Sequence, residues 1–273
     1  MAQMKTPGVY IIEKNAFPNS VVEVATAIPA FIGHTQFARD GNKDLTGIPF
    51  RISSMAEFHS FFGFAPTLRF GIRPEDSESE DTTNDINVLF PDGSCQLTLP
   101  KTFYALYYNM LLFYANGGGP CYIVSIGDYE HDFKSIDFTN ALLALKKEQE
   151  PTLVVVPEAV YMEEGDCYKV QTAALMHCGN DMKNRFAILD VFNGYKDENG
   201  AVIKSFRENI GSNFLAYCAS YYPWINTSIV TEKDITFYNI EKDSLEKLEE
   251  LILNEFSKKS GVTNEAVNEL MDK

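Results

Sequence analysis

Two short stretches decide the fold: TLVVV at residues 152–156 and RFAILDV at residues 185–191. Both are nearly continuous apolar runs, and such runs are typical of parallel strands that are covered on both faces. A helix pattern precedes each run, over residues 138–147 and 167–178 respectively. Because a helix followed by a buried strand is the repeating unit of α/β proteins, these stretches predict a parallel sheet flanked by helices.

The same succession of elements occurs upstream and downstream of these runs. An aromatic helix is expected over residues 103–114, before a strand at 120–126. A further helix is expected over residues 206–217, before a strand at 219–224. Four such units in a row predict an α/β fold with a mixed, largely parallel sheet, flanking helices and an extended N-terminal β arm, which is described below.

The body of the protein is predicted to span residues 27–240. It begins with the apolar run IPAFIG at residues 28–33, which predicts another buried strand. Ser54 is placed to accept hydrogen bonds at the start of a short helix over residues 55–62. Residues 74–87, PEDSESEDTTNDIN, are acidic and nearly free of apolar side chains, so they are expected to form a surface insertion.

The first 26 residues differ from the body, because they show no helical period and are punctuated by prolines. The runs VYII at residues 9–12 and VVEV at residues 21–24 favour extended structure. An apolar strand at a terminus can join its own sheet or add to the edge of another subunit's sheet, and the residues alone favour neither. The candidate inter-subunit residues of this arm are Pro7, Gly8, Val9, Tyr10, Ile11, Ile12, Val21, Val22 and Val24.

The tail, residues 241–273, has a helical character. Ser244 is expected to cap a helix whose apolar stripe contains Leu245, Leu248, Ile252 and Phe256. A glycine then interrupts the pattern, and a second short helix is expected before the last residue.

Composition narrows the classes of partner. The formal net charge is −15, which argues against nucleic acid as the main partner, since phosphate binding needs clustered Lys and Arg. The same charge disfavours an anionic membrane surface, and no membrane-inserting segment is predicted. The five cysteines are spread along the chain without a CxxC unit, which favours reduced, buried thiols over a redox or zinc site.

The sequence contains no convincing motif for catalysis or cofactor binding. The glycines of NGGG at residues 116–119 follow a helix and lead into a strand, whereas a phosphate-binding loop leaves a strand and enters a helix. A helix stop is therefore the better interpretation. The histidines show no metal-ligand spacing, and no GxSxG elbow occurs. We therefore expect no catalytic, cofactor-binding or metal-binding residues, and a protein that is not an enzyme.

One aromatic cluster stands out near the end of the body. Tyr221, Tyr222 and Trp224 lie together in SYYPWIN, and aromatic clusters of this kind can stack against bases or sugars. With no basic residue between them, nucleic-acid binding is disfavoured. Packing in the core, or against a neighbouring subunit, is the preferred interpretation.

Several of these stretches resemble contractile tail sheath proteins, which occur in myophage tails and in phage-tail-like injection systems. The most specific is PGVYIIEKNAFPNSVVEVATAIPAFIGHT, which begins at Pro7. LLFYANGGGPCYIVSIG, LVVVPEAV, KNRFAILDV and ASYYPWINTSIV follow in the order that the family shows. The similarity covers most of residues 6–230 and is strongest to sheaths of extracellular contractile injection particles of the antifeeding-prophage and virulence-cassette type.

The resemblance implies a mechanical function. Sheath subunits stack as hexameric discs around an inner tube made of a second protein, and they assemble on a baseplate. On triggering they contract without nucleotide hydrolysis and drive the tube through a target envelope. The implied partners are other sheath subunits, the tube protein, and baseplate and terminal cap proteins. The implied location is the bacterial cytoplasm during assembly, and then a virion tail or a released particle. By the same likeness, residues 7–24 form an arm that adds strands to neighbouring subunits.

Family members usually continue into a C-terminal domain, so residues 241–273 are expected to lead toward such a domain. Two alternatives stay open beside the sheath subunit. A cap or adaptor protein at a sheath end would use the same fold. A nucleotide-dependent α/β enzyme is disfavoured, because it would need a glycine loop after a strand.

Overall fold

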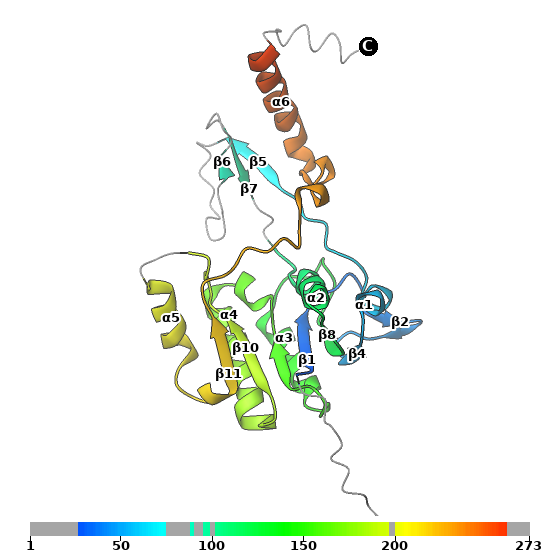
Figure 1. Cartoon of the computed structure of the whole chain (residues 1–273), viewed down its shortest axis with the longest axis vertical. Coiled ribbons are helices and arrows are strands. Elements are labelled where there is room, and N and C mark those ends of the chain that lie inside the picture. Colours follow the sequence, from blue (N-terminus) through cyan, green and yellow to red (C-terminus); the bar gives the residue numbers. More distant parts are fainter. Residues whose placement is uncertain (1–26, 75–87, 90–94, 99–101, 197–199, 261–273) are drawn as a thin grey trace, which may run out of the picture.

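The structure is a computed structural model, and it describes residues 27–74, 88–89, 95–98, 102–196 and 200–260. Its centre is a six-stranded sheet in the order β11-β10-β9-β1-β8-β4 (Figure 1). Five strands are parallel, and the edge strand β4 runs antiparallel to β8. The strands are β1 (Pro29–Gly33), β4 (Phe50–Ile52), β8 (Cys121–Ser125), β9 (Leu153–Val155), β10 (Phe186–Asp190) and β11 (Cys218–Tyr221). This arrangement confirms the predicted α/β fold.

Helices connect the parallel strands, as the sequence predicts. The chain enters a neighbouring strand on one side of β1 and then returns to build the other side, which is the doubly wound arrangement. A short hairpin of β2 (Arg39–Asp40) and β3 (Lys43–Asp44) precedes β4. The helices of the body are α1 (Met55–Phe62), α2 (Leu106–Ala115), α3 (Ser135–Leu145), α4 (Glu164–Met176) and α5 (Ala201–Ile210).

The sheet separates two hydrophobic cores, because alternate residues of a strand point to opposite faces. In β1, Ala30 and Ile32 belong to the larger core, whereas Phe31 belongs to the smaller one. The larger core includes residues of α3 and α4, for example Phe138 and Val170. The smaller core is formed with α1 and α2. Helices therefore lie on both faces of the central strands.

The ends of several elements follow local chemistry that the sequence reveals. The Ser54 hydroxyl accepts a hydrogen bond from the Glu57 N–H, and α1 ends before Gly63, so the predicted cap is confirmed. The NGGG segment does terminate α2, because Asn116 follows its last turn and Gly117 adopts a positive φ of 82°.

The predicted bounds of two helices were wrong. The helix expected over residues 103–114 begins only at Leu106. The helix expected over residues 206–217 is α5, which begins after Gly200 and ends before Gly211, both at positive φ. Leu215–Tyr217 form a separate 3₁₀ turn, η3. Apolar residues on both sides of Gly211 hid this break in the sequence pattern.

A smaller sheet lies beside the body and carries the helical tail (Figure 1). Its order is β5-β7-β6, and all its pairings are antiparallel. A small core formed by Ile72, Cys95 and Leu251 joins this sheet to α6. The Ser244 hydroxyl, just before α6, accepts a hydrogen bond from the Ile72 N–H at 2.9 Å. The elements are β5 (Gly71–Pro74), β6 (Val88–Leu89), β7 (Cys95–Thr98) and α6 (Leu245–Ser260).

Short helical turns complete the described chain. They are η1 (Ala159–Tyr161), the π-helix η2 (His177–Met182), and η4 (Glu232–Asp234), η5 (Phe237–Asn239) and η6 (Lys242–Ser244) between β11 and α6. No helix within the described ranges combines the length and the apolar character that crossing a lipid bilayer requires.

Candidate functional site

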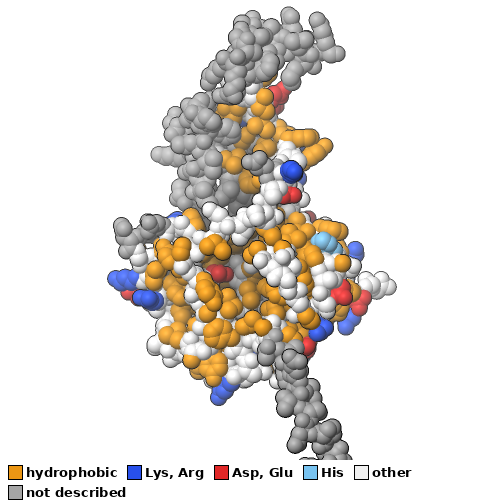
Figure 2. Space-filling model, viewed as in Figure 1, with side chains coloured by type: hydrophobic (Ala, Val, Ile, Leu, Met, Phe, Trp, Pro, Cys, Tyr) orange, Lys and Arg blue, Asp and Glu red, His pale blue; other side chains and the backbone are white. Residues whose placement is uncertain are grey.

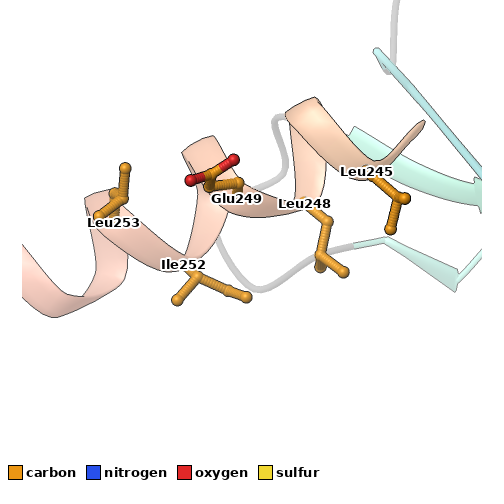
Figure 3. A pocket seen from close by; sticks show the side chains of 5 residues that line it. All are labelled: Leu245, Leu248, Glu249, Ile252 and Leu253. Carbon is orange, nitrogen blue, oxygen red and sulfur yellow. The ribbon is translucent and has the colours of Figure 1, made fainter. Parts of the chain in front are cut away.

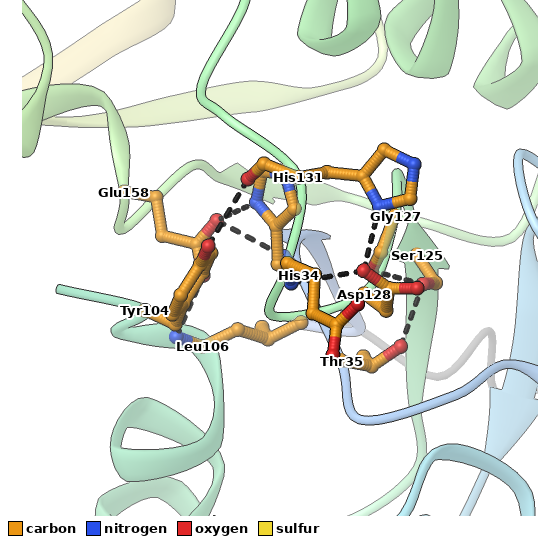
Figure 4. Close-up of polar contacts among 10 residues, drawn as sticks. His34, Thr35, Tyr104, Leu106, Ser125, Gly127, Asp128, His131 and Glu158 are labelled. Carbon is orange, nitrogen blue, oxygen red and sulfur yellow. Dashed lines mark hydrogen bonds and ion pairs between the residues drawn. The ribbon is translucent and has the colours of Figure 1, made fainter. Parts of the chain in front are cut away.

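The carboxyl ends of β1 and β9 are the place where a doubly wound sheet would bind a ligand, because the chain leaves these neighbouring strands in different directions. His34 directly follows β1, and Glu158 lies just beyond β9 (Figure 4). Oε2 of Glu158 lies 2.7 Å from Nδ1 of His34 and also accepts a hydrogen bond from the His34 backbone N–H at 2.9 Å. Both side chains are buried.

The other oxygen of the Glu158 carboxyl group accepts a hydrogen bond from the start of a helix. Oε1 of Glu158 accepts a hydrogen bond from the Leu106 N–H, in the first turn of α2. The cap residue of α2, Ala105, provides no side-chain hydrogen bond. Glu158 therefore supplies from a distant loop a hydrogen-bond acceptor for one of the free N–H groups at the start of α2. Burial raises the pKa of the Glu158 carboxyl, and the hydrogen bonds from His34 and Leu106 oppose that rise.

The surroundings of His34 are aromatic and closed. Its ring packs against Tyr104, Phe133 and Phe138, with centroid separations of 4.9–6.1 Å. The neighbouring Thr35 hydroxyl is already engaged with the Ser125 hydroxyl at 2.6 Å. With these groups buried and bonded to one another, the geometry supports a structural junction between β1, β9 and α2. The described residues contain no cluster of three His, Cys, Asp or Glu side chains that could hold a metal ion.

A second buried polar group lies at the π-helix η2. Arg185 donates hydrogen bonds to the carbonyl oxygens of Leu145, the last residue of α3, and of Glu148, just beyond it. Its Nη1 also contacts Nε2 of His177 at 3.0 Å. His177 thus pairs with Arg185. Burial, helped by the Arg185 charge, lowers the pKa of His177 to about 4, so the imidazole accepts this bond in its neutral form.

The predicted arm residues cannot be compared with the structure. Pro7, Gly8, Val9, Tyr10, Ile11, Ile12, Val21, Val22 and Val24 all lie outside the described residues. The same holds for the acidic segment after Pro74, up to residue 87, and for the second short helix expected after residue 261.

The most distinctive exposed feature is residues 209–231, which we call the edge segment. It contains no Lys, Arg, Asp or Glu, although the protein as a whole is strongly acidic. The segment includes β11, one of the two edge strands of the six-stranded sheet. Large apolar side chains are exposed along it: Leu215 is 48% exposed, Tyr221 71% and Ile225 82%. Exposed apolar surface of this kind marks protein–protein contact sites.

The edge segment is anchored to the body through Trp224. Its indole N–H donates to the Val191 carbonyl oxygen at 3.0 Å, and its backbone N–H donates to the Gly194 carbonyl at 3.0 Å. The ring packs near Tyr161 and Tyr195. The residues of the aromatic cluster therefore differ in position: Trp224 is half-buried against the body, whereas Tyr221 is exposed.

Further apolar side chains are exposed beyond the edge segment. Phe237 is 61% exposed and Tyr238 73%. On α6, Leu245, Leu248, Ile252 and Leu253 line an open groove together with Glu249 (Figure 3). Figure 2 shows hydrophobic side chains over much of the face of the body that is turned toward the viewer, where β10 and β11 lie in Figure 1.

Sequence reasoning identified part of this surface. It selected Tyr221, Tyr222 and Trp224 by their clustering, but it did not select the exposed residues around them, because an apolar run reads as core. The absence of charged residues across residues 209–231 was visible in the sequence and could have pointed to this segment. The His34–Glu158 junction had no motif spacing that could reveal it.

Comparisons with known proteins do not assign the chain to a family. No protein-family model matches it, and a comparison with curated proteins found no significant match. The fold and the surface define a doubly wound α/β protein with a buried polar junction at the carboxyl ends of β1 and β9 and an exposed sheet edge without charged residues.

Proposed function

We propose that this protein is a structural subunit of a contractile tail sheath. In this function it polymerises as stacked rings around an inner tube and contracts to drive the tube through a target envelope. The observation that carries the proposal is the edge segment, residues 209–231, which is apolar, exposed and free of charge. An acidic subunit that contacts copies of itself needs such a surface, because like charges facing each other would oppose association.

Two further observations support the proposal. The sequence blocks that resemble sheath proteins include LVVVPEAV and KNRFAILDV, which contain β9 and β10, and ASYYPWINTSIV, which lies in the edge segment. At the carboxyl ends of β1 and β9, where an enzyme of this fold would bind its ligand, the Glu158 carboxyl group is bonded to His34 and to the first turn of α2.

The proposed partners are other copies of this chain, an inner tube protein, and baseplate and cap proteins. Residues 7–24 are proposed to link subunits by strand addition. Assembly would take place in the bacterial cytoplasm, and the product would be a virion tail or a released particle.

Electron microscopy tests the proposal directly. The protein is expressed at its natural length together with its tube protein, and the expected result is rings or striated tubes that an antibody against this chain decorates along their length. Decoration at one tube end only would favour a cap or adaptor. A monomer that forms no rings or tubes, with a melting temperature raised by a nucleotide, would instead support the enzyme alternative.

A further inference from the structure

Asp190 is the last residue of β10, so it lies at the carboxyl edge of the sheet, where doubly wound proteins bind their ligands. Because side chains alternate along a strand, its carboxyl group projects to the face opposite that of Ala187 and Leu189, which belong to the larger core. Phe186 and Ile188 share the face of Asp190, and all three are partly buried. The carboxyl group therefore lies at the end of an apolar strip that solvent still reaches.

Aromatic side chains from two neighbouring segments lie close to this carboxyl group. Asp190 pairs with Tyr221 of the edge strand β11, and paired residues project to the same face of a sheet. Tyr161 belongs to η1, which follows β9. Burial, and then the charges of Asp190 and Glu158, raise the pKa of Tyr161 to about 12, so this phenol lies within electrostatic reach of Asp190. Aromatic rings can face a cation as well as an apolar group.

The Asp190 carboxyl group has no partner within the described ranges: no hydrogen bond or ion pair involves it there, and burial is the cause of its raised pKa. Burial also raises the pKa of Glu158, but there the hydrogen bonds from His34 and Leu106 oppose the rise. Removing a carboxylate from water without pairing it costs free energy. A residue that carries such a cost at a ligand-binding edge is a candidate for pairing with a group outside the chain.

The group that would pair with Asp190 is a cation, and its chemistry can be narrowed. Ca²⁺ and Mg²⁺ take several oxygen ligands, whereas the described part of the chain offers no group of three His, Cys, Asp or Glu side chains for a metal ion. An organic cation needs only one carboxylate. A guanidinium group binds a carboxylate through two parallel hydrogen bonds, is more weakly hydrated than an ammonium group, and stacks on aromatic rings. A partly buried carboxylate beside Tyr161 and Tyr221 matches these properties.

We propose that Asp190 binds the guanidinium group of an arginine side chain that a neighbouring protein subunit presents. The guanidinium pairs with the Asp190 carboxylate and packs against the ring of Tyr221, which projects to the same face. The pair offsets the cost of burying the carboxylate, because the charge gains a partner when the subunits meet. The inference rests on the proposed function, since a neighbouring subunit is present only if the protein assembles with others.

The surroundings of Asp190 favour a protein as the source of this arginine over a free small cation. The edge segment, which contains Tyr221, also exposes the apolar side chains of Leu215 and Ile225. A protein partner that carries one arginine among apolar residues would cover these side chains as well, and arginine is enriched among the residues that dominate binding at protein contacts. The net charge of −15 also attracts a basic group to this protein.

Nuclear magnetic resonance with two side-chain analogues tests the site on the isolated protein. n-Propylguanidinium reproduces the arginine side chain, and n-propylurea is a neutral molecule of nearly the same shape. At constant ionic strength the guanidinium is expected to shift the backbone amide signals of Asp190 and Tyr221 in a saturable manner, whereas the urea should not. Asp190→Asn should weaken this binding at least about tenfold, because the charge-assisted hydrogen bonds are lost. Asp40→Asn, which removes one negative charge from an exposed position on β2, should bind as the wild type does.

The stability of the isolated variant distinguishes a binding residue from a structural one. If Asp190 held the fold together, Asp190→Asn would unfold at a lower urea concentration than the wild type. If the carboxylate is buried for the sake of a ligand, removing its charge should raise the urea midpoint, because a neutral amide loses less on leaving water. Far-UV circular dichroism measures both midpoints, and Asp40→Asn should unfold at the wild-type midpoint.

Assembly shows whether a neighbouring subunit supplies the arginine. Asp190→Asn and Asp40→Asn are each expressed together with the tube protein, and rings and tubes are counted in electron micrographs at equal protein concentration. Asp190→Asn should form at least about tenfold fewer of them than the wild type, since each subunit contact loses its ion pair. Asp40→Asn should assemble as the wild type does.

The outcomes separate this inference from the proposed function. Binding of n-propylguanidinium that depends on Asp190, with a raised urea midpoint and impaired assembly of Asp190→Asn, supports the proposal. Equal shifts with n-propylurea or in Asp190→Asn, or a lowered midpoint, overturn it. Rings or tubes that form equally well with Asp190→Asn overturn it while leaving the sheath function intact. A wild-type protein that binds the guanidinium but forms no rings or tubes supports the arginine site and counts against the sheath function.

Discussion

The carboxyl group of Glu158 and the imidazole of His34 are in contact at 2.7 Å, although 124 residues separate them in the chain. The same carboxyl group receives the backbone N–H groups of His34 and Leu106, so one buried side chain joins the ends of β1 and β9 to the start of α2. A polar junction of this kind fixes the relative position of three elements, because each donor loses its partner if any element shifts.

Replacing this carboxyl group is expected to destabilise the protein. In Glu158→Gln, one acceptor oxygen becomes an NH₂ group that faces a backbone N–H donor, either that of His34 or that of Leu106. A buried donor that is left without its acceptor costs about 1–3 kcal/mol. Urea denaturation followed by far-UV circular dichroism measures the loss. Glu163→Gln, at an exposed position, is the control, and equal stability of the two variants would contradict the junction.

The His177–Arg185 contact predicts a dependence of stability on pH. The folded-state pKa of His177 is about 4, below the value of about 6.5 in an unfolded chain. Between these pH values the unfolded chain binds a proton that the folded protein does not bind. The stabilising contribution is therefore complete above pH 6.5 and is lost as the pH falls toward 4.

The variant His177→Gln should remove this contribution, since a glutamine oxygen can accept the Arg185 hydrogen bond without titrating. Between pH 7.5 and 4.5, the free energy of unfolding should fall by about 2–3 kcal/mol more for the wild type than for the variant. Urea titrations at several pH values measure the difference. Parallel pH profiles for the two proteins would show that folding does not lower the pKa of His177.

The position of Trp224 predicts that adding one methyl group at Gly194 destabilises the protein. A Cβ atom at Gly194 would collide with the Trp224 indole and approach the Val191 carbonyl oxygen to 2.8 Å. Gly194→Ala should therefore displace the ring, break its hydrogen bond to Val191 and cost about 1–3 kcal/mol. Trp224 is the one tryptophan in the sequence, so a red shift of its emission reports the displacement.

Gly165→Ala provides the matched control for this substitution. A Cβ atom at Gly165 meets no heavy atom within 4 Å, and the residue lies in the first turn of α4, where alanine favours the helix. This variant should keep the wild-type emission and equal or exceed the wild-type stability. An unshifted emission in Gly194→Ala as well would mean that Trp224 is not held as the structure shows.

The sequence predicted the parallel part of the sheet because its signal is local. The runs at residues 152–156 and 185–191 contain β9 and β10 within one or two residues, since continuous apolar segments of this length favour buried strands. Their predicted cover on both faces is not met within the described chain, where Phe186 and Ile188 remain partly exposed. Apolar runs predict burial, and they do not reveal which part of the protein provides it.

Contacts between residues far apart in the chain could not be predicted from the sequence. The His34–Glu158 junction uses residue types that occur throughout the protein, at no motif spacing. The small sheet was missed because β6 has two residues and β7 has four, too few to show an alternating pattern. Its pairing with α6 joins Ile72 to Leu251, and nothing local in either segment indicates that contact.

The link between the small sheet and α6 gives the last prediction. The Ser244 hydroxyl is buried and accepts the Ile72 N–H at 2.9 Å, so Ser244→Ala would leave a buried donor without its partner. Such a loss costs about 1–2 kcal/mol, and here it acts on a small core of few apolar residues. Amides of β5 and β7 should therefore exchange with deuterium about tenfold faster, as measured by mass spectrometry of peptic peptides.

Amides of β1 and β8 should keep their wild-type rates, because their core is separate. Ser60→Ala, which removes an exposed hydroxyl from α1, controls for the substitution itself. If β5 and β7 exchange at wild-type rates in Ser244→Ala, the hydroxyl does not hold α6 on this sheet; if β1 and β8 accelerate equally, the small sheet and the body unfold as one unit.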